Sequence, residues 1–279
     1  MDYEPPFLET YKALVQNHVD DSKNDSSLVE RCELPVIDLG KFNYERDECE
    51  KEIAEAANKW GFFQVVNHGI SQELLKSLEF EQKKLFYQPF VNKSAKFNFS
   101  SLSAKTYRWG NPFATNLRQL SWSEAFHFYL SDISWMDQHH SMRYPPCPIS
   151  SKVHGLLPHS DTSFLTIVHQ DQVGGLQLMK DGKWVGVKPN PQALVVNIGD
   201  FFQAFSNGVY KSIKHRVVAS EKVERFSVAF FYCPSEEAVI ESHIKPATYR
   251  KFTSREYRQQ TEKDVKQTGD KVGLSRFLL

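Results

Sequence analysis

The sequence lacks long apolar runs, an excess of either charge and any close grouping of cysteines. No stretch approaches the length that a membrane-spanning helix needs. The 34 Lys and Arg residues balance the 34 Asp and Glu residues, so no net field would attract nucleic acid or an anionic membrane. The 4 cysteines have neither metal-site spacing nor the density of a disulfide framework, which favours reduced thiols.

An N-terminal targeting signal is also absent from the pattern. Residues 1–6 are acidic and Pro-containing, without the apolar segment of a secretory signal peptide. We therefore expect a cytoplasmic location, with the nucleus as a second compartment. A chain of 279 residues with 41% hydrophobic content is long enough for one large domain with a substantial core, or two small ones.

Composition divides the chain into three parts. Residues 1–30 are polar and predict a flexible arm. Residues 31–142 predict an N-terminal module of helices and strands. Residues 143–279 contain short β-prone runs separated by Gly, Pro, Asn and Asp, and then a polar helix that begins near Ser254. This pattern predicts an α+β protein with a mainly β core, built as a sandwich or barrel.

Two helices are expected in the N-terminal module. Asn43 can cap the first, which would end at Trp60. Ser71 can cap the second. The side chains expected on the buried face of this second helix are Leu74, Leu75, Leu78, Leu85 and Phe86.

Two histidines and one carboxylate have the spacing of ligands to a single metal ion. His159 and Asp161 are two residues apart at the end of an extended run, so their side chains point to the same face. A later β-prone run supplies His215. Two imidazoles and one carboxylate on one face of a metal leave three positions open, which is typical of non-haem Fe(II) sites that activate oxygen. The alternative is a chance surface pair, with His215 at a strand end.

Arg225 and Ser227 form a second pair two residues apart in a β-prone run. A guanidinium beside a hydroxyl is suited to holding a carboxylate. A turn and a neighbouring strand would place this anion site beside the metal. The alternative is a structural ion pair between Arg225 and either Glu221 or Glu224.

These residues and the motifs around them resemble plant 2-oxoglutarate- and Fe(II)-dependent dioxygenases. The matching segments are residues 60–69, 144–148, 159–161, 174–178, 197–200, 206–216 and 224–227. Within that family, residues 107–112 and 119–127 are similar to the branch of gibberellin 2-oxidases that takes twenty-carbon gibberellins. The resemblance covers nearly everything after residue 30.

The resemblance implies a double-stranded β-helix, the cupin-like jelly roll, with an N-terminal helical and strand module and a C-terminal helix. It also implies Fe(II) held by His159, Asp161 and His215, with 2-oxoglutarate and dioxygen as co-substrates and ascorbate as reductant. The reaction would be gibberellin 2β-hydroxylation, which deactivates the hormone, coupled to conversion of 2-oxoglutarate to succinate and carbon dioxide.

The same resemblance suggests roles for further residues. Arg225 and Ser227, with Tyr144 as a third donor, would bind the far carboxylate of 2-oxoglutarate. Tyr144 could instead simply pack beside the prolines that follow it. For the gibberellin, Arg108 would clamp a carboxylate, with Tyr107 and Phe113 as wall residues. An ordinary structural or solvated arginine is the alternative for Arg108.

One segment departs from the family. Members carry several helices between the segment matched by residues 131–134 and the motif that begins at Arg143, whereas here residues 135–142 join the two directly. Met142 also stands where the family usually has asparagine. His139 and His140 in this stretch predict a solvated loop. The missing helices would leave one face of the larger sheet apolar and exposed, which favours self-association of an otherwise monomeric protein.

Three functional readings follow. The first is the gibberellin enzyme, which acts on a small molecule and needs neither nucleic acid nor membrane. The second keeps the chemistry but takes a flavonoid or another small plant metabolite. The third is a non-catalytic truncated form that binds a ligand or a partner without turnover.

Overall fold

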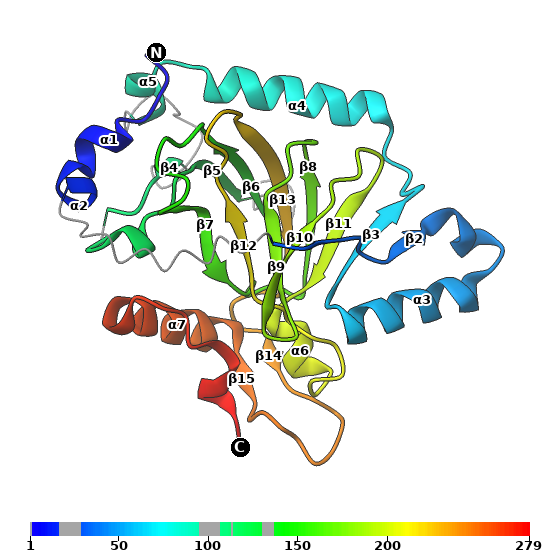
Figure 1. Ribbon diagram of the computed structural model, residues 1–279. Coiled ribbons are helices and arrows are strands. Elements are labelled where there is room, and N and C mark those ends of the chain that lie inside the picture. The colour runs from blue at the N-terminus through cyan, green and yellow to red at the C-terminus, as the bar shows by residue number, and fades with distance from the viewer. Residues whose placement is uncertain (1, 17–28, 95–106, 113, 130–136) are drawn as a thin grey trace.

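Two β-sheets face each other in this computed structural model, which describes residues 2–16, 29–94, 107–112, 114–129 and 137–279 (Figure 1). The larger sheet has eight strands in the order β2-β3-β11-β8-β13-β6-β5-β4, and the smaller has five in the order β1-β10-β9-β12-β7. From β7 to β13 the chain crosses repeatedly between the two sheets. This crossing is the arrangement of a double-stranded β-helix, and it confirms the mainly β core.

The strands are short, as the spacing of turn residues predicts. Those of the larger sheet are β2 (Val36–Asp38), β3 (Phe62–Val66), β4 (Tyr107–Trp109), β5 (Glu124–Tyr129), β6 (Asp137–Tyr144), β8 (Leu165–Gln170), β11 (Leu194–Ile198) and β13 (Arg225–Tyr232). Those of the smaller sheet are β1 (Arg31–Cys32), β7 (His154–His159), β9 (Leu176–Lys180), β10 (Lys183–Val187) and β12 (His215–Val218). A separate pair joins β14 (Val239–Ile240) to β15 (Phe252–Thr253).

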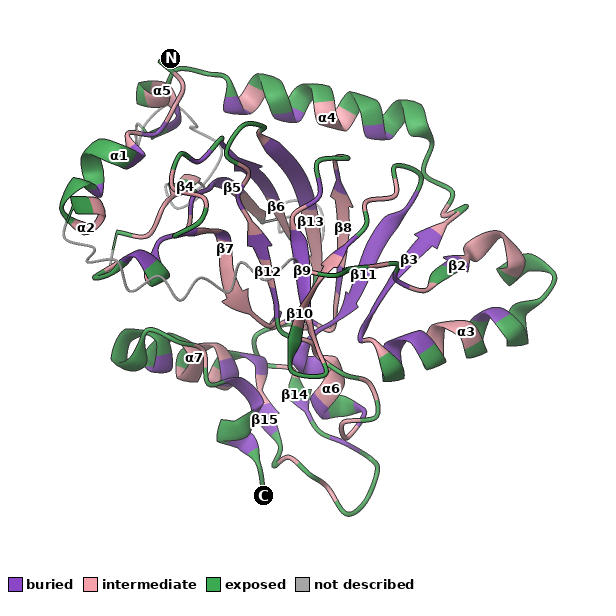
Figure 2. Ribbon diagram, in the orientation of Figure 1, coloured by how far each residue is buried: buried purple, intermediate pink, exposed green. Residues whose placement is uncertain are grey.

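Buried apolar side chains from both sheets fill the space between them. Phe62, Met142 and Val195 come from the larger sheet and pack with Leu178 and Val217 of the smaller. Alternate residues on these strands point inward, which is the packing expected of two facing sheets. Figure 2 shows the buried strands at the centre and exposed residues on the outer surfaces of the helices.

Helices cover the outer face of the larger sheet. α3 (Arg46–Lys59) packs Ala56 in one cluster with Val65 and Val196. α4 (Gln72–Phe86) packs Phe86 against Phe126 and Phe226. The expected exposed apolar face therefore does not extend over the strands that these two helices cover.

The second predicted helix forms as α4, with one error in its buried face. The Ser71 hydroxyl accepts a hydrogen bond from the Leu74 backbone N–H at 3.2 Å, which confirms the predicted cap. Leu75 and Phe86 are buried, but Leu74 is 62% exposed. Leu74 lies in the first turn, on the side of the helix that faces away from the sheet.

The remaining helices lie before, between and after the strands along the chain. They are α1 (Phe7–Thr10), α2 (Lys12–Gln16), α5 (Phe90–Ser94), α6 (Asp200–Phe205) and α7 (Ser254–Thr268), with 3-10 turns η1 (Leu39–Asn43), η2 (Leu117–Gln119) and η4 (Gly273–Phe277). α7 begins at the predicted Ser254, where the Thr253 hydroxyl caps the Glu256 N–H at 3.1 Å.

Three of the predicted boundaries differ from the structure. The first predicted helix forms as α3 but begins at Arg46, so Asn43, which ends η1, does not cap it. Residues 2–16, predicted as part of a flexible arm, include α1 and α2, and Phe7 and Tyr11 are buried against Trp122 and its neighbours. The boundary between residues 142 and 143 falls inside β6, and β4 and β5 extend the same sheet. The first residues are polar on average, which hid the two aromatic side chains that pack into the core. The predicted boundary fails because residues 142 and 143 belong to the same β-strand.

Candidate metal and carboxylate site

A cavity of about 410 Å³ lies between the two sheets. Its lining includes the three predicted metal ligands, the predicted carboxylate-binding residues and Arg108. The larger and the smaller sheet both contribute, so the double-stranded β-helix itself brings these distant sequence positions together.

The three predicted metal ligands converge on one point. His159 ends β7 and His215 begins β12, and the two are direct partners across these antiparallel strands. The His159 Nε2 atom lies 3.5 Å from Asp161 Oδ1, and the His215 Nε2 atom lies 3.7 Å from the same oxygen. One ligand atom from each residue lies within 4.8 Å of the others, which is a spacing that could hold a metal ion.

Hydrogen bonds orient the Asp161 carboxylate. Its Oδ2 atom accepts from the Thr166 hydroxyl at 2.7 Å and from the Asn197 side-chain N–H at 2.8 Å. Burial alone would raise the pKa of Asp161, but the nearby His215 and His159 and the Thr166 hydrogen bond hold it well below its usual value. The two hydrogen bonds occupy Oδ2, so Oδ1 is the oxygen that faces the histidines.

The two imidazoles are also oriented by their backbone partners. The His159 Nδ1 atom lies 2.7 Å from the Leu157 carbonyl, and the His215 Nδ1 atom lies 3.1 Å from the Ile213 carbonyl. A carbonyl only accepts, so Nδ1 carries the proton and Nε2 offers its lone pair. Burial lowers the pKa of His215 to about 4, so this ring is neutral at pH 7.

Two imidazole lone pairs and one carboxylate oxygen thus point at one place, where they would repel one another without a cation. This donor set fits Fe(II), for which two histidines and one carboxylate form a facial triad with open positions. The residues present therefore match the metal that the sequence suggested.

A second buried carboxylate, Asp200, holds the loop that carries the ligands. It accepts hydrogen bonds from the Ser160 hydroxyl at 3.2 Å, the Ser212 hydroxyl at 2.6 Å and Tyr257. The Lys271 ammonium lies 2.6 Å from Asp200 and also donates to the Ser160 carbonyl at 2.9 Å. Residues from α7 and the segment after it thereby fix the loop between His159 and Asp161.

The predicted carboxylate-binding residues are buried together on the larger sheet. Arg225 donates to the Ser227 hydroxyl at 3.1 Å and to Gln170 Oε1 at 2.8 Å. Its guanidinium carbon lies 4.8 Å from the centroid of the Tyr144 ring. The Arg225 Nε atom is buried and has no hydrogen-bond partner among the described residues.

No described carboxylate forms an ion pair with Arg225. Asp171 interacts with it electrostatically but accepts its hydrogen bonds from the backbone of Phe226 and Val173. Glu224, the proposed structural partner, pairs with Arg143 at 2.8 Å. A buried guanidinium without a carboxylate partner is costly, so this site is suited to an anionic ligand.

The position of the strand that carries Arg225 differs from the prediction. Arg225 was expected on a strand beside that of His215, but β12 and β13 belong to opposite sheets. The cavity spans the space between the sheets, so the anion site still lies beside the candidate metal site.

The predicted substrate residues have three different outcomes. Arg108 is exposed and lines the cavity. Tyr107 does not line it, because successive residues of β4 point to opposite faces; its hydroxyl donates to Glu124 at 2.6 Å on the outer face. The role of Tyr107 as a wall residue is therefore wrong, and Phe113 lies outside the described residues.

Several site residues were missed at the sequence level. His140, expected in a solvated loop, lies in β6 and lines the cavity. Its cross-strand partner is His127, whose ring centroid is 4.1 Å away. Burial lowers the pKa of His127 to about 4 and that of His140 to about 3. The alternating pattern of residues 124–129 could have indicated a strand that contains His127. It could not have indicated which strand pairs with it, because strand pairing depends on distant segments.

Two family models match the chain. Residues 133–234 match the 2OG-Fe(II) oxygenase superfamily, and residues 34–146 match the model described as the non-haem dioxygenase in morphine synthesis N-terminal region. Every helix within the described ranges is too short or too polar to span a lipid bilayer.

Curated relatives match almost the whole chain. It is 46% identical to gibberellin 2-beta-dioxygenase 8 of Arabidopsis thaliana, over 99% of this chain and 98% of that protein. It is 41% identical to gibberellin 2-beta-dioxygenase 5 of Oryza sativa subsp. japonica, over 98% of this chain and 96% of that protein. The first alignment spans 336 residues while this chain has 279, so at least 57 aligned positions have no counterpart here. That difference agrees with the predicted absence of a family segment.

Solved structures match the fold. The chain is similar to JOX2 in complex with 2OG, Fe and JA, with 28% identity and a TM-score of 0.69 over 84% of this chain and 86% of that one. It is also similar to the dioxygenase for auxin oxidation in rice, with 24% identity and a TM-score of 0.74 over 88% and 100% of the two chains. These likenesses confirm the predicted double-stranded β-helix.

Proposed function

Because this chain belongs to the 2OG-Fe(II) oxygenase superfamily, we propose that it hydroxylates a gibberellin at the 2β position and thereby deactivates the hormone. Fe(II), 2-oxoglutarate and dioxygen are the cofactor and co-substrates of this family. The observation that carries the proposal is 46% identity to a gibberellin 2-beta-dioxygenase across 99% of the chain. The preserved cluster of His159, Asp161 and His215 supports it.

His159, Asp161 and His215 would hold the iron. Bound iron with 2-oxoglutarate supplies oxygen activation, coupled to formation of succinate and carbon dioxide. The carbonyl contacts at both Nδ1 atoms and the two hydrogen bonds at Asp161 Oδ2 keep the ligand atoms aimed at one point. The protein thus contributes a preformed geometry for the metal.

Arg225 and Ser227 would bind the far carboxylate of 2-oxoglutarate, with Tyr144 against the guanidinium. All three are buried, so the charge-assisted hydrogen bonds would form away from bulk water. Binding at that end would orient the 2-oxo acid end toward the iron. The apolar lining contributed by Phe62, Leu156 and Val168 would limit water near the reacting centre.

Arg108 remains our candidate for the substrate carboxylate. It lies on the cavity wall, and its charge acts on His127 of the neighbouring strand β5 and on His140 of β6. A mainly apolar cavity wall with the Arg108 guanidinium on it matches a substrate that is mainly hydrocarbon with a carboxylate.

Succinate release tests the function. Purified protein with Fe(II), ascorbate and 2-oxoglutarate would be assayed with and without a twenty-carbon gibberellin, and the product identified by mass spectrometry. We expect gibberellin-dependent succinate and a hydroxylated product. A flavonoid that stimulates turnover when the gibberellin does not would replace the proposed substrate, since flavanone 3-dioxygenase 2 of Oryza sativa subsp. japonica is 34% identical over 82% of this chain.

The missing segment supports one second candidate, a non-catalytic form. The predicted metal ligands and carboxylate-binding residues all lie at or after Tyr144, beyond the position of the predicted gap. Ligand binding could therefore persist in a form that has no turnover. Folded protein that binds 2-oxoglutarate but releases no succinate with either substrate class would favour this candidate. A cytoplasmic monomer is part of the same proposal, and sedimentation would test the monomeric state.

A further inference from the structure

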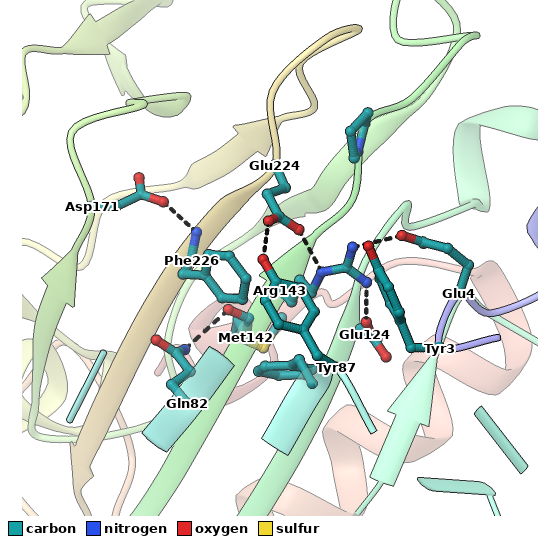
Figure 3. Close-up of polar contacts among 12 residues, drawn as sticks. Tyr3, Glu4, Gln82, Tyr87, Glu124, Met142, Arg143, Asp171, Glu224 and Phe226 are labelled. Carbon is teal, nitrogen blue, oxygen red and sulfur yellow. Dashed lines mark hydrogen bonds and ion pairs between the residues drawn. The ribbon is translucent and has the colours of Figure 1, made fainter. Parts of the chain in front are cut away.

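A cluster of buried and half-buried charged side chains lies on the outer face of the larger sheet, directly behind the residues assigned to 2-oxoglutarate. We call Glu4, Lys93, Glu124, Arg143 and Glu224 the charge cluster, and Tyr144, Arg225 and Ser227 the clamp. Figure 3 shows the Arg143 side chain among Glu4, Glu124 and Glu224.

All three guanidinium nitrogens of Arg143 donate hydrogen bonds to carboxylates. Nε donates to Glu224 at 2.8 Å, Nη1 to Glu124 at 2.6 Å and Nη2 to Glu4 at 2.6 Å. Arg143 is 1% exposed and Glu124 is fully buried. Glu124 is neutralised on its other oxygen by Lys93 at 2.6 Å. Such a satisfied network is rigid, because moving any member leaves a buried charge without a partner.

The charge cluster and the clamp share the same stretches of backbone. Arg143 immediately precedes Tyr144 in β6, and Glu224 immediately precedes Arg225 at the start of β13. Neighbouring residues of a strand point to opposite faces, so the ion pair lies outside and the clamp inside. Tyr144 and Arg225 are themselves direct partners across β6 and β13.

α4 adds a further brace between the same two strands. The Gln82 side-chain N–H group donates to the Met142 carbonyl of β6 at 3.3 Å and to the Ser227 carbonyl of β13 at 2.9 Å. The Tyr87 hydroxyl, just after α4, donates to Glu224. These contacts fix both strands from the outer face, at or next to the residues that form the clamp.

We propose that Glu224 and Arg143 are positioning residues for 2-oxoglutarate: their ion pair holds together the ends of β6 and β13, where Tyr144 and Arg225 are the last partners of the ladder. The proposal rests on the clamp binding the far carboxylate, as assigned above. Glu4 completes the charge cluster but comes from the N-terminal segment, so its bond does not join the two clamp strands.

This difference supplies a matched pair of variants. Glu224→Gln and Glu4→Gln each remove one carboxylate from Arg143, and the two carboxylates are similarly exposed, at 28% and 33%. Only Glu224 connects to the strand of Arg225. Both variants keep a hydrogen-bonding side chain of the same size, so each should remain folded.

The ligands are 2-oxoglutarate and 2-oxopentanoate, which has the same chain but no far carboxylate. Binding to the Mn(II)-loaded protein would be followed by tryptophan fluorescence, with the thermal midpoint of each variant measured in parallel. We expect Glu224→Gln to weaken 2-oxoglutarate binding about tenfold, in line with other supporting residues, and to leave 2-oxopentanoate unchanged. Glu4→Gln should change neither affinity by as much as twofold.

Equal losses of thermal stability in both variants, with unchanged 2-oxoglutarate affinity, would overturn the positioning role and leave the charge cluster purely structural. Wild-type protein that binds the two ligands equally would instead overturn the clamp assignment itself. Neither comparison uses a gibberellin or measures succinate release. A failure of the positioning role can therefore be distinguished from a failure of the proposed function.

Discussion

The Asn197 side-chain N–H group lies 2.8 Å from Asp161 Oδ2, and this contact decides which carboxylate oxygen faces the histidines. Thr166 shares the same oxygen at 2.7 Å. Asn197 and Thr166 lie on β11 and β8, which are direct partners at these two positions. The larger sheet therefore orients a ligand whose two histidine partners come from the smaller sheet.

Thr166→Val should weaken metal binding about tenfold, because the supporting hydrogen bond to a ligating carboxylate is lost while side-chain volume is kept. Titration with Co(II), followed by absorbance, measures the affinity. Ser163→Ala is the matched control, since the Ser163 hydroxyl contacts Thr166 at 3.0 Å but has no hydrogen bond to Asp161. Equal affinities for wild type and Thr166→Val would show that Asn197 alone orients the carboxylate.

Lys271→Met should destabilise the protein strongly. The substitution leaves Asp200, with a side chain only 5% exposed, without its cationic partner, and breaking a buried pair costs about 3–5 kcal/mol. Urea unfolding of the metal-free protein measures this loss. The control is Lys188→Met, whose partner Glu33 lies 2.7 Å away but whose pair is exposed, so the unfolding curve should stay close to that of wild type.

Metal affinity gives the functional side of the same variant. Lys271 also donates to the Thr162 hydroxyl at 2.8 Å, and so holds the residue that follows Asp161. We expect Co(II) to bind Lys271→Met more weakly than wild type. Unchanged affinity would mean that the loop keeps its shape through Ser160 and Tyr257 alone.

Local patterns predicted the parts of the site that lie on single strands. Residues two apart share a face, so the sequence sufficed for His159 with Asp161 and for Arg225 with Ser227. The assignment to two opposing sheets was not available, because which strands pair depends on contacts between distant segments. For that reason Gln170 and Asn197 were missed, although both hydrogen-bond to predicted site residues.

Other errors came from reading composition as exposure. The first residues are polar on average, yet Phe7 stacks on Trp122 with ring centroids 4.4 Å apart and ties the segment down. Arg143 and Glu124 would be assigned to the surface by type alone. They are buried because each charge finds its partner on another element.

Stability of the metal-free protein should fall in acid. Burial, with a contribution from Arg216, lowers the pKa of His154 to about 4 from a usual value of 6.5. The unfolded chain then binds more protons than the folded one between these values. The contribution of His154 is therefore complete above about pH 6.5 and is lost as the pH falls through about 4.

Calorimetry of the metal-free protein at several pH values would measure this dependence. His154→Gln cannot titrate, so the variant should show a shallower loss on the acid side, by on the order of 1–3 kcal/mol between pH 7 and 4. The His154 Nδ1 atom is buried without a partner among the described residues. Its Nε2 atom accepts a hydrogen bond from Arg216 at 3.2 Å, and the glutamine side-chain oxygen keeps an acceptor for that donor. If His154→Gln lost as much stability in acid as wild type, the pH dependence would come from other buried histidines.

Gly155 of β7 controls the position of Tyr144 from the opposite sheet. A Cβ atom at Gly155 would lie 2.7 Å from Tyr144 Cδ1, which is too close without movement of the ring. Gly155→Ala should cost about 1–3 kcal/mol through overpacking. Because the ring that moves lies 4.8 Å from the Arg225 guanidinium, the variant should also bind 2-oxoglutarate more weakly than wild type.

Gly186→Ala is the control for that variant. Gly186 also lies within a strand, β10, and the nearest atom to an added Cβ would be 3.8 Å away, an ordinary contact. Its stability and 2-oxoglutarate affinity should stay close to those of wild type. If Gly155→Ala lost stability but kept full affinity for 2-oxoglutarate, Tyr144 would be a packing residue, because displacing its ring would then leave the carboxylate site intact.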